Sequence, residues 1–121
     1  MIKKVLHSAF EVKDLNEAIE LYKKLGFQEE AKFEKENGKA QAAVLKLDNF
    51  AFELWQFNDQ GSEYYKIKDH IGFLVDDLES QIEEFKEAGA RIIIPITRGI
   101  TVKRYAFIEN IDGKVFELVE L

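Results

Sequence analysis

The sequence predicts an α+β protein in which one unit, made of a strand, a helix and two or three further strands, occurs twice. Strand-like alternation followed by helical periodicity appears at the start of each half of the chain. Matching residues in the two halves keep a constant separation of 63 positions, as His7 and His70 or Phe10 and Phe73 do. The repeat therefore indicates a duplicated unit that shares one core.

The first half begins with the alternating strand VLHSAFEV, followed by the sequence DLNEAIELYKKLG. Apolar residues recur in that second segment at the spacing of one helical face: Leu15, Ala18, Ile19, Tyr22 and Leu25. Asp14 is the predicted N-cap, with Glu17 three residues later, and Gly26 is the predicted end of the helix.

The second half repeats this order with the strand HIGFLV and the helical sequence DDLESQIEEFKEAG. Its apolar stripe consists of Leu78, Ile82, Phe85 and Ala88. The closing strand LDNFAFELW recurs as IDGKVFELV at a separation of 64 positions, so the intervening loops differ by one residue. Turns are expected at Glu36-Asn37-Gly38, Asp48-Asn49 and Asp112-Gly113.

These boundaries predict a single domain over residues 1–121. Module 1 covers about 1–57, a linker about 58–69, and module 2 about 70–121.

Composition argues against several classes of function. The net charge of -6 without a basic block disfavours nucleic acid as a partner, and no apolar run approaches the ~20 residues of a membrane span. The N-terminal sequence does not resemble a secretory signal. The absence of cysteine removes thiolate ligands and thiol nucleophiles and fits a cytoplasmic protein.

Strand alternation assigns both histidines and two glutamates to one face. Successive side chains of a strand point to opposite sides, so Phe52 and Leu54 share the face that packs on the helix. The other face carries His7 and Glu53 in the first half, and the second half repeats the pattern with His70 and Glu117. All four are predicted to face an apolar cup.

A carboxylate in such a cup needs a partner, because a buried unpaired charge costs several kcal/mol. Two imidazoles and two carboxylates form a four-ligand set for one divalent ion, with Zn, Ni, Co, Mn or Fe as candidates. Open coordination positions would suit Lewis-acid catalysis. Alternatives remain: ordinary half-buried histidines, solvated glutamates, or salt bridges of the glutamates with Lys3, Lys46 or Arg104.

With His near the start of each module and Glu in its last strand, the chain resembles the vicinal oxygen chelate superfamily of glyoxalase I, methylmalonyl-CoA epimerase, extradiol dioxygenases, and fosfomycin- and bleomycin-resistance proteins. The sequences RYAFIENIDGKVFELVEL and DHIGFLVDDLESQIEEFKEAGARI carry the resemblance. It implies two tandem βαβββ modules that form a curved mixed sheet around a central cup. The ligands that it implies are His7, Glu53, His70 and Glu117.

The two-His, two-Glu set is similar to that of glyoxalase I, a lactoylglutathione lyase. This likeness implies a metal-dependent lyase or isomerase that moves a proton on a small substrate with vicinal oxygens. Glu117 is then the leading catalytic base and Glu53 its partner. The superfamily also implies a homodimer, with the site built within a chain or across the dimer.

Two positions depart from the related enzymes. Glyoxalase I has an arginine where this chain has Glu11, which argues against glutathione as the co-substrate. The epimerase branch is similar around ENGKAQAAVLKLDNFAFELWQF, but its base aligns with Gln41. A non-catalytic binding protein of the bleomycin-resistance kind, an epimerase and a fosfomycin-resistance enzyme therefore remain alternatives.

Substrate contacts are predicted at two places. Trp55 and Phe57 share the cup face with Glu53 and are expected to stack on a planar or apolar part of the substrate, or simply to pack. The sequence PITRGITVKRYAF has a local excess of positive charge that would clamp an anion or form an ordinary solvated loop: Arg98, Lys103 and Arg104.

Overall fold

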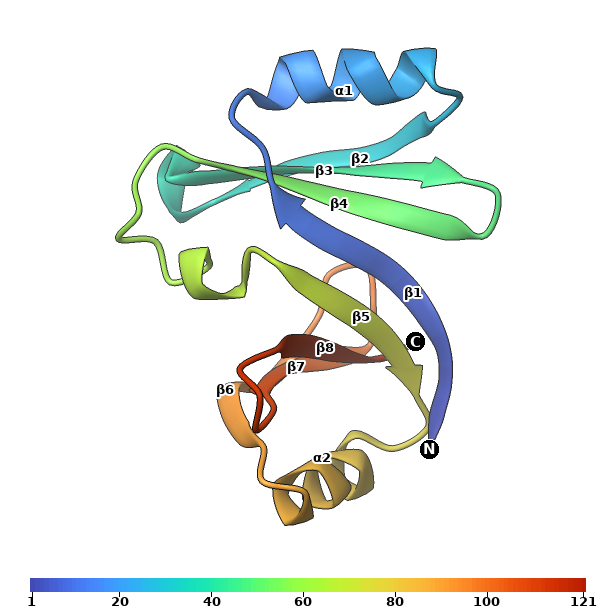
Figure 1. The fold of residues 1–121 in the computed structure, drawn as a ribbon, viewed down its shortest axis with the longest axis vertical. Coiled ribbons are helices and arrows are strands. Elements are labelled where there is room, and N and C mark those ends of the chain that lie inside the picture. Colours follow the sequence, from blue (N-terminus) through green and yellow to red (C-terminus); the bar gives the residue numbers. More distant parts are fainter. The chain divides into compact units, whose positions relative to one another are not determined.

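The computed structural model describes residues 1–121, and its strands and helices follow the order expected from the repeat (Figure 1). The first half contains β1 (Ile2–Glu11), α1 (Leu15–Lys24), β2 (Gln28–Lys35), β3 (Ala40–Leu47) and β4 (Phe50–Phe57). The second half contains β5 (His70–Val75), α2 (Leu78–Glu87), β6 (Arg91–Arg98), β7 (Arg104–Glu109) and β8 (Val115–Glu120). Short 3-10 turns lie at Glu36–Gly38 and Tyr65–Ile67.

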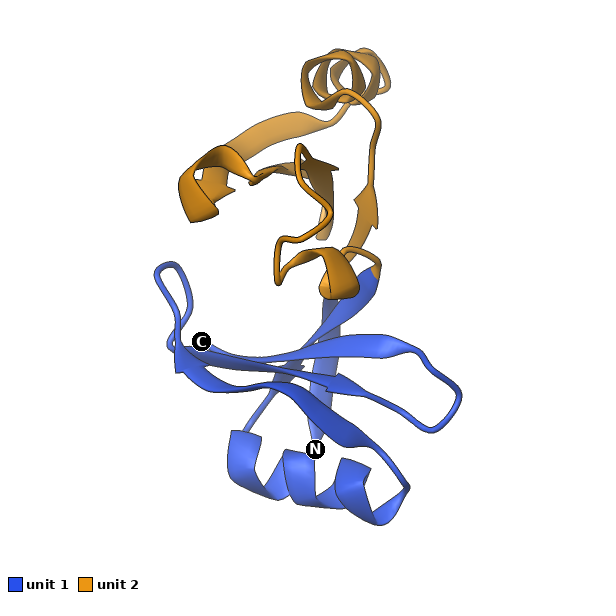
Figure 2. Ribbon diagram, turned by 90° about the vertical axis from the view of Figure 1, so that its left-hand side faces the viewer, with its two compact units in different colours: residues 1–6, 70–121 blue, residues 7–69 orange.

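The chain divides into two compact units, coloured separately in Figure 2. Unit 2 consists of His7–Asp69, and unit 1 consists of Met1–Leu6 together with His70–Leu121. Strand β1 crosses the boundary, so its N-terminal part belongs to unit 1 and the part from His7 onward belongs to unit 2.

Unit 2 contains a four-stranded mixed sheet in the order β2-β3-β4-β1. The β2/β3 and β3/β4 pairs are antiparallel, whereas β1 and β4 run parallel. The register sets Ala9 of β1 and Val44 of β3 on either side of Glu53 in β4. Glu53 therefore lies on a central strand with small or apolar neighbours.

Helix α1 covers one face of the unit 2 sheet (Figure 1). Its Leu15 and Ile19 pack with Ala43, Leu45 and Leu54 of the sheet, all of them buried. Partly buried aromatic side chains surround this cluster, with edge contacts and one stacked pair between them: Phe10, Tyr22, Phe27 and Phe52. Strand alternation had predicted the helix-facing positions of Phe52 and Leu54 within this set.

Unit 1 repeats the arrangement with strand order β5-β8-β7-β6. Strands β5 and β8 run parallel, and the β7/β8 and β6/β7 pairs are antiparallel. Helix α2 contributes Leu78 and Ile82 to the buried cluster, against residues of three strands: Val75, Ala106, Ile108 and Leu118. The predicted α+β class, with two βαβββ modules and mixed sheets, is confirmed.

The helix ends also follow the sequence signals. Asp14 accepts the backbone N–H of Glu17 at 3.0 Å, as expected of an N-cap. Gly26 and Gly89 follow the two helices with φ of 108° and 96°, a left-handed conformation that favours glycine. Neither helix is long and apolar enough to cross a membrane.

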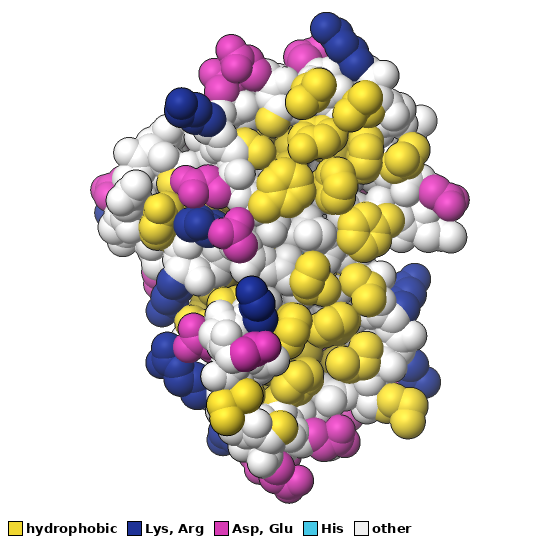
Figure 3. Space-filling model, viewed as in Figure 1, with side chains coloured by type: hydrophobic (Ala, Val, Ile, Leu, Met, Phe, Trp, Pro, Cys, Tyr) yellow, Lys and Arg dark blue, Asp and Glu magenta, His cyan; other side chains and the backbone are white.

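Apolar side chains also reach the surface, where Figure 3 shows them gathered in patches between charged side chains. The exposed ones in unit 2 include Leu21, Leu25, Leu47 and Phe50. Those in unit 1 include Ile92, Ile100, Ile111 and Leu121. Exposed apolar residues are common on monomers as well, so the homodimer stays a prediction.

Candidate metal centre

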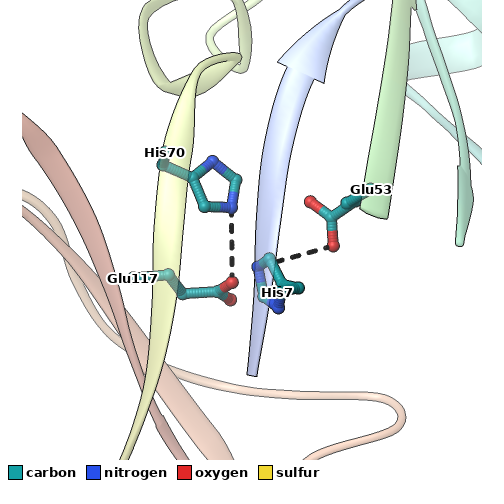
Figure 4. Close-up of side chains that lie close together, drawn as sticks. All are labelled: His7, Glu53, His70 and Glu117. Carbon is teal, nitrogen blue, oxygen red and sulfur yellow. Dashed lines mark ion pairs between the residues drawn. The ribbon is translucent and has the colours of Figure 1, made fainter. Parts of the chain in front are cut away.

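The first half of the candidate site is a histidine and glutamate pair in unit 2. His7 lies on β1 and Glu53 on the adjacent parallel strand β4, with His7 Nε2 at 3.9 Å from Glu53 Oε2 (Figure 4). The two side chains are 14% and 16% exposed. Both are therefore mostly removed from water but still accessible.

The second half of the candidate site is the equivalent pair in unit 1. His70 lies on β5 and Glu117 on the adjacent parallel strand β8, with His70 Nε2 at 3.5 Å from Glu117 Oε1 (Figure 4). The imidazole side chain is fully buried and meets the ring of Phe107 edge to face at 4.9 Å. The Phe107 ring therefore forms part of the buried surroundings of His70.

The faces of both pairs agree with the predicted alternation. Phe52 and Leu54, which flank Glu53 on β4, belong to the cluster under α1, and Trp55 belongs to a different cluster. Phe116 and Leu118, which flank Glu117, belong to the cluster under α2. Because strand side chains alternate, each glutamate points away from its helix.

The geometry of each pair is compatible with a metal ion. Separations of 3.5 and 3.9 Å exceed an ordinary hydrogen bond of about 2.7–3.2 Å. Two ligands bound at about 2.1 Å to one ion lie about 3.0–3.4 Å apart at ordinary coordination angles. The pair in unit 1 is close to that spacing, and the pair in unit 2 would need a small shift. Each pair thus offers one imidazole nitrogen and one carboxylate oxygen that fit a divalent transition ion.

Two of the three cations considered as salt-bridge partners for the glutamates lie beside other carboxylates. Lys3 Nζ lies 3.4 Å from Asp76. Arg104 binds Glu120 and Glu79. Lys46 is exposed, at the end of β3.

Trp55 and Phe57 occupy the same side of β4 as Glu53. Trp55 is buried among Ala9, Ala40 and Ala42, and its ring stacks on Phe57 and Tyr64. The indole N–H donates to Glu53 Oε1 at 2.8 Å. The substrate contact of Trp55 and Phe57 stays a prediction. The hydrogen bond from the indole to Glu53 is a further role of Trp55 that the sequence did not predict.

The predicted anion clamp lies on β6, β7 and the loop between them. Arg98 and Lys103 are exposed near the two ends of this loop. Gly99 is required there, since a Cβ at that position would lie 2.6 Å from the carbonyl oxygen of Val102. Arg104 uses its guanidinium for two carboxylates, at 2.7 Å from Glu120 and 2.9 Å from Glu79. An anionic substrate would have to compete with these bonds.

Glu11, the position that distinguishes the chain from glyoxalase I, has a cation beside it. Its carboxylate lies 3.4 Å from Lys68 Nζ, and Lys68 also binds Asp69 at 2.8 Å. The pKa of Lys68 is raised, chiefly by its hydrogen bond to Asp69 and further by Glu11. The negative charge that was expected to repel glutathione is therefore partly neutralised.

Gln41 lies on the opposite face from Glu53. It alternates with Ala42 and shares its face with Ala43 and Leu45 of the cluster under α1. Val44 is the residue that stands beside Glu53 on β3. The register of β3 therefore sets Gln41, the residue aligned with the epimerase base, on the helix-facing side of the sheet and not beside Glu53.

Sequence reasoning missed a buried carboxylate network in unit 1. Glu120, the residue after the closing strand's repeated motif, is 6% exposed. It accepts the backbone N–H of Leu78 at 2.8 Å and both of its oxygens bind Arg104. Asp77 and Glu79 lie beside Glu120, but Arg104 already neutralises Glu79 and Glu120. The sequence repeat pairs Glu120 with Gln56, and this match of two polar residues at the end of an apolar strand could have pointed to a structural role for Glu120.

Comparison with solved structures supports the fold. Methylmalonyl-CoA epimerase from Mycobacterium tuberculosis is 24% identical, with a TM-score of 0.78 over 98% of this chain and 88% of that chain. A variant of the Streptomyces coelicolor methylmalonyl-CoA epimerase in complex with 2-nitronate-propionyl-CoA is 20% identical, with a TM-score of 0.79 over 99% and 95%. A hypothetical protein from Bacillus halodurans C-125 is 21% identical, with a TM-score of 0.77 over 98% and 94%.

The sequence itself was compared with curated proteins and with family models. No curated protein matches it significantly. One family model, described as Glyoxalase/Bleomycin resistance protein/Dioxygenase superfamily, matches residues 4–118. Since this match covers nearly the whole chain, the protein belongs to the Glyoxalase/Bleomycin resistance protein/Dioxygenase superfamily.

Proposed function

We propose that this protein is a metal-dependent isomerase or lyase that moves a proton on a small substrate with vicinal oxygens. The observation that carries the proposal is the repeated pair, His7 with Glu53 and His70 with Glu117, at 3.9 and 3.5 Å. Each pair offers one imidazole nitrogen and one carboxylate oxygen, donors that suit a divalent transition ion. Membership in the superfamily and the fold shared with methylmalonyl-CoA epimerases support this assignment.

A bound divalent ion would polarise the substrate oxygens and so acidify the neighbouring C–H bond. The chain's own residues then perform the proton transfer. The Glu117 carboxylate accepts the proton from the substrate carbon and returns it, as a general acid and base. Glu53, held by Trp55, neutralises part of the positive charge. His7 on β1 and His70 on β5 would serve as the imidazole ligands of the ion.

Aromatic side chains of unit 2 form a wall on the face of β4 that carries Glu53, and an apolar part of the substrate is proposed to lie against it. Trp55 is stacked between Phe57 and Tyr64, with ring centroids 5.7 Å apart in each pair. The Nζ of Lys35 lies 5.7 Å from the Tyr64 ring and carries a positive charge at this wall. A planar or acyl group next to the vicinal oxygens fits these surroundings.

The same wall favours a second candidate, a small-molecule binding protein without catalysis. Stacked aromatic side chains bind planar ligands by dispersion and need no metal ion. In this alternative His7, Glu53, His70 and Glu117 serve only as polar contacts to the ligand. Metal dependence separates the two candidates.

The first test is metal content by plasma mass spectrometry on protein purified without a metal-affinity tag. The matched variant is His7→Ala combined with His70→Ala. We expect close to one transition ion per chain in the wild type and a loss of that ion in the variant. Wild-type protein that stays metal-free after reconstitution with Zn, Ni, Co, Mn and Fe would exclude the metal-dependent enzyme and favour the binding protein.

The second test asks for the reaction. Metal-loaded protein in deuterated water is incubated with acyl-CoA thioesters, including methylmalonyl-CoA, and with hemithioacetals of glutathione and of other thiols. Incorporation of deuterium at the carbon beside the carbonyl, followed by NMR, is the expected result for one of these classes. Absence of exchange in every class, with metal bound, would contradict the proton-transfer proposal.

A further inference from the structure

We infer that Trp55 is a positioning residue that fixes the carboxylate of Glu53 for metal binding. The inference rests on the proposed function, in which Glu53 is a ligand. Its basis is the hydrogen bond from the indole Nε1–H to Glu53 Oε1 at 2.8 Å. Both side chains lie on the same face of β4, two residues apart, so the strand itself brings them together.

The donor is held rigidly. Trp55 is only 4% exposed, and its ring is stacked on Phe57 and Tyr64 with interplanar angles of 11° and 13°. The ring of Phe33 meets its edge at 5.8 Å. An indole packed on several sides cannot rotate to another acceptor without opening this cluster, so its N–H direction is set in advance.

The hydrogen bond divides the two oxygens of Glu53 between two tasks. Oε1 accepts the indole N–H, whereas Oε2 is the oxygen that lies 3.9 Å from His7 Nε2. A bond to a carboxylate is charge-assisted and stronger than one between neutral groups. Outer-shell donors of this kind orient a ligand, and their loss typically costs 10–100-fold in metal affinity.

The sequence repeat does not preserve the tryptophan that donates to Glu53. The repeat pairs Phe52, Glu53 and Leu54 with Phe116, Glu117 and Leu118, but the position that matches Trp55 is Val119. Val119 is buried and carries no side-chain donor. The two glutamates, equivalent by sequence, therefore differ in their surroundings.

The hydrogen bond from Trp55 limits what the Glu53 carboxylate can do. If Glu53 moved away to take a proton, it would leave the indole N–H of Trp55 buried without its acceptor, which is unfavourable. The hydrogen bond from Trp55 therefore favours the role of a fixed ligand for Glu53. Trp55 acts on the reaction through Glu53 and does not itself move a proton.

The test compares Trp55→Phe, which keeps an aromatic ring and removes the N–H, with Phe33→Leu, which removes a ring contact and keeps the N–H. Dissociation constants for Zn and Co are measured by calorimetric titration of metal-free protein. Thermal unfolding of the metal-free proteins reports packing separately. We expect Trp55→Phe to weaken metal binding roughly 10-fold or more and Phe33→Leu to leave it within about twofold.

Fluorescence of the wild type provides a second measurement that does not depend on the variants folding. Trp55 is the only tryptophan of the chain, so a change in its emission during metal titration reports on the indole bonded to Glu53. Unchanged emission during stoichiometric binding would overturn the inference. Equal metal affinity of Trp55→Phe and the wild type would also overturn it, while leaving the metal site itself intact. Failure of the proposed function would instead appear as no metal binding in any of the proteins.

Discussion

Arg104 on β7 and Glu120 on the adjacent strand β8 form a bidentate ion pair. Arg104 Nε donates to Glu120 Oε1 at 2.8 Å, and Nη2 donates to Oε2 at 2.7 Å. The second oxygen also accepts the N–H of Leu78, the first residue of α2. One side chain thus ties the closing strand to the helix of unit 1, and its carboxylate is neutralised by a planar cation of matching geometry.

Replacement of Arg104 by Leu is expected to lower the free energy of unfolding by about 2–3 kcal/mol, because it leaves a buried carboxylate without its cation. The matched control is Glu79→Gln, which removes the exposed partner of the same arginine and should cost clearly less, because an exposed ion pair contributes little to stability. Urea unfolding of both variants measures this difference. Equal losses in the two variants would show that burial of Glu120 adds nothing to the pair.

The same network predicts an acid-dependent loss of stability. Arg104 lowers the pKa of Glu79 from 4.5 to about 2 and also lowers the pKa of Glu120. A carboxyl whose pKa is depressed by folding stabilises the native state fully above the ordinary value, and this contribution is lost as the pH falls through the folded value. Stability should therefore decline between about pH 4.5 and about pH 2.

Thermal unfolding of the wild type and of Arg104→Leu across that range measures the effect. The slope of Tm against pH should be smaller in the variant, because its glutamates no longer bind a cation when folded. Parallel curves would assign the acid sensitivity to other carboxylates.

Gln56 caps α1 in the way that Glu120 caps α2. Its Oε1 accepts the N–H of Leu15 at 2.7 Å, and the two capping residues are equivalent in the repeat. Gln56→Ala should reduce the free energy of unfolding by about 1 kcal/mol. Gln41→Ala, a change at the position beside Gln56 in the register of β3 and β4, is the control. The capping interpretation requires that Gln56→Ala cost clearly more than this control in chemical denaturation.

Glu117→Gln is expected to lower turnover roughly 10²–10⁴-fold once a substrate is identified, because an amide cannot accept the proton. The amide oxygen still offers a ligand atom, so part of the metal should remain. Turnover and metal content are measured on the same preparation, with Glu109→Gln as the control on the neighbouring strand. Unchanged turnover in Glu117→Gln would remove this residue from the mechanism.

Glu11 and Lys68 test the choice of co-substrate. Glu11→Arg should raise kcat/KM with a glutathione hemithioacetal, because it replaces an anion with a cation at the position where glyoxalase I has arginine. Lys68→Gln should lower it, because Lys68 lies 3.4 Å from the Glu11 carboxylate and offsets its charge. Kinetics of both variants with this substrate decide the point. If neither value changes, the position does not contact the thiol part of the substrate.

Much of the candidate site could be predicted from periodicity. Alternation along β4 and β8 determines which side chains face the helix, and the buried clusters under α1 and α2 contain the expected Leu54 and Leu118. The same rule sets Glu53 and Glu117 on the other face. Pairing of each glutamate with a histidine required only that the first and last strand of a module be neighbours, which they are in both units.

Contacts between side chains of different strands could not be predicted in this way. They depend on which residue stands beside which, and a one-residue change of register turns every side chain to the other face. Gln41 illustrates this, because the register pairs it with Gln56, whereas Val44 stands beside Glu53. The bidentate ion pair of Arg104 with Glu120 likewise requires that the register of β7 and β8 set these two residues side by side.

The sequence by itself determined the duplicated α+β fold, the helix ends and the faces of the strands, because these follow from local periodicity and from the conformational preferences of single residues. Only the tertiary structure decided which carboxylates receive a fixed donor or cation. Trp55 binds Glu53, Arg104 binds Glu120, and Lys68 lies beside Glu11. The physical reason is that such bonds need two groups within about 3–4 Å and correctly oriented, a condition that register and packing impose and that the order of residues does not state.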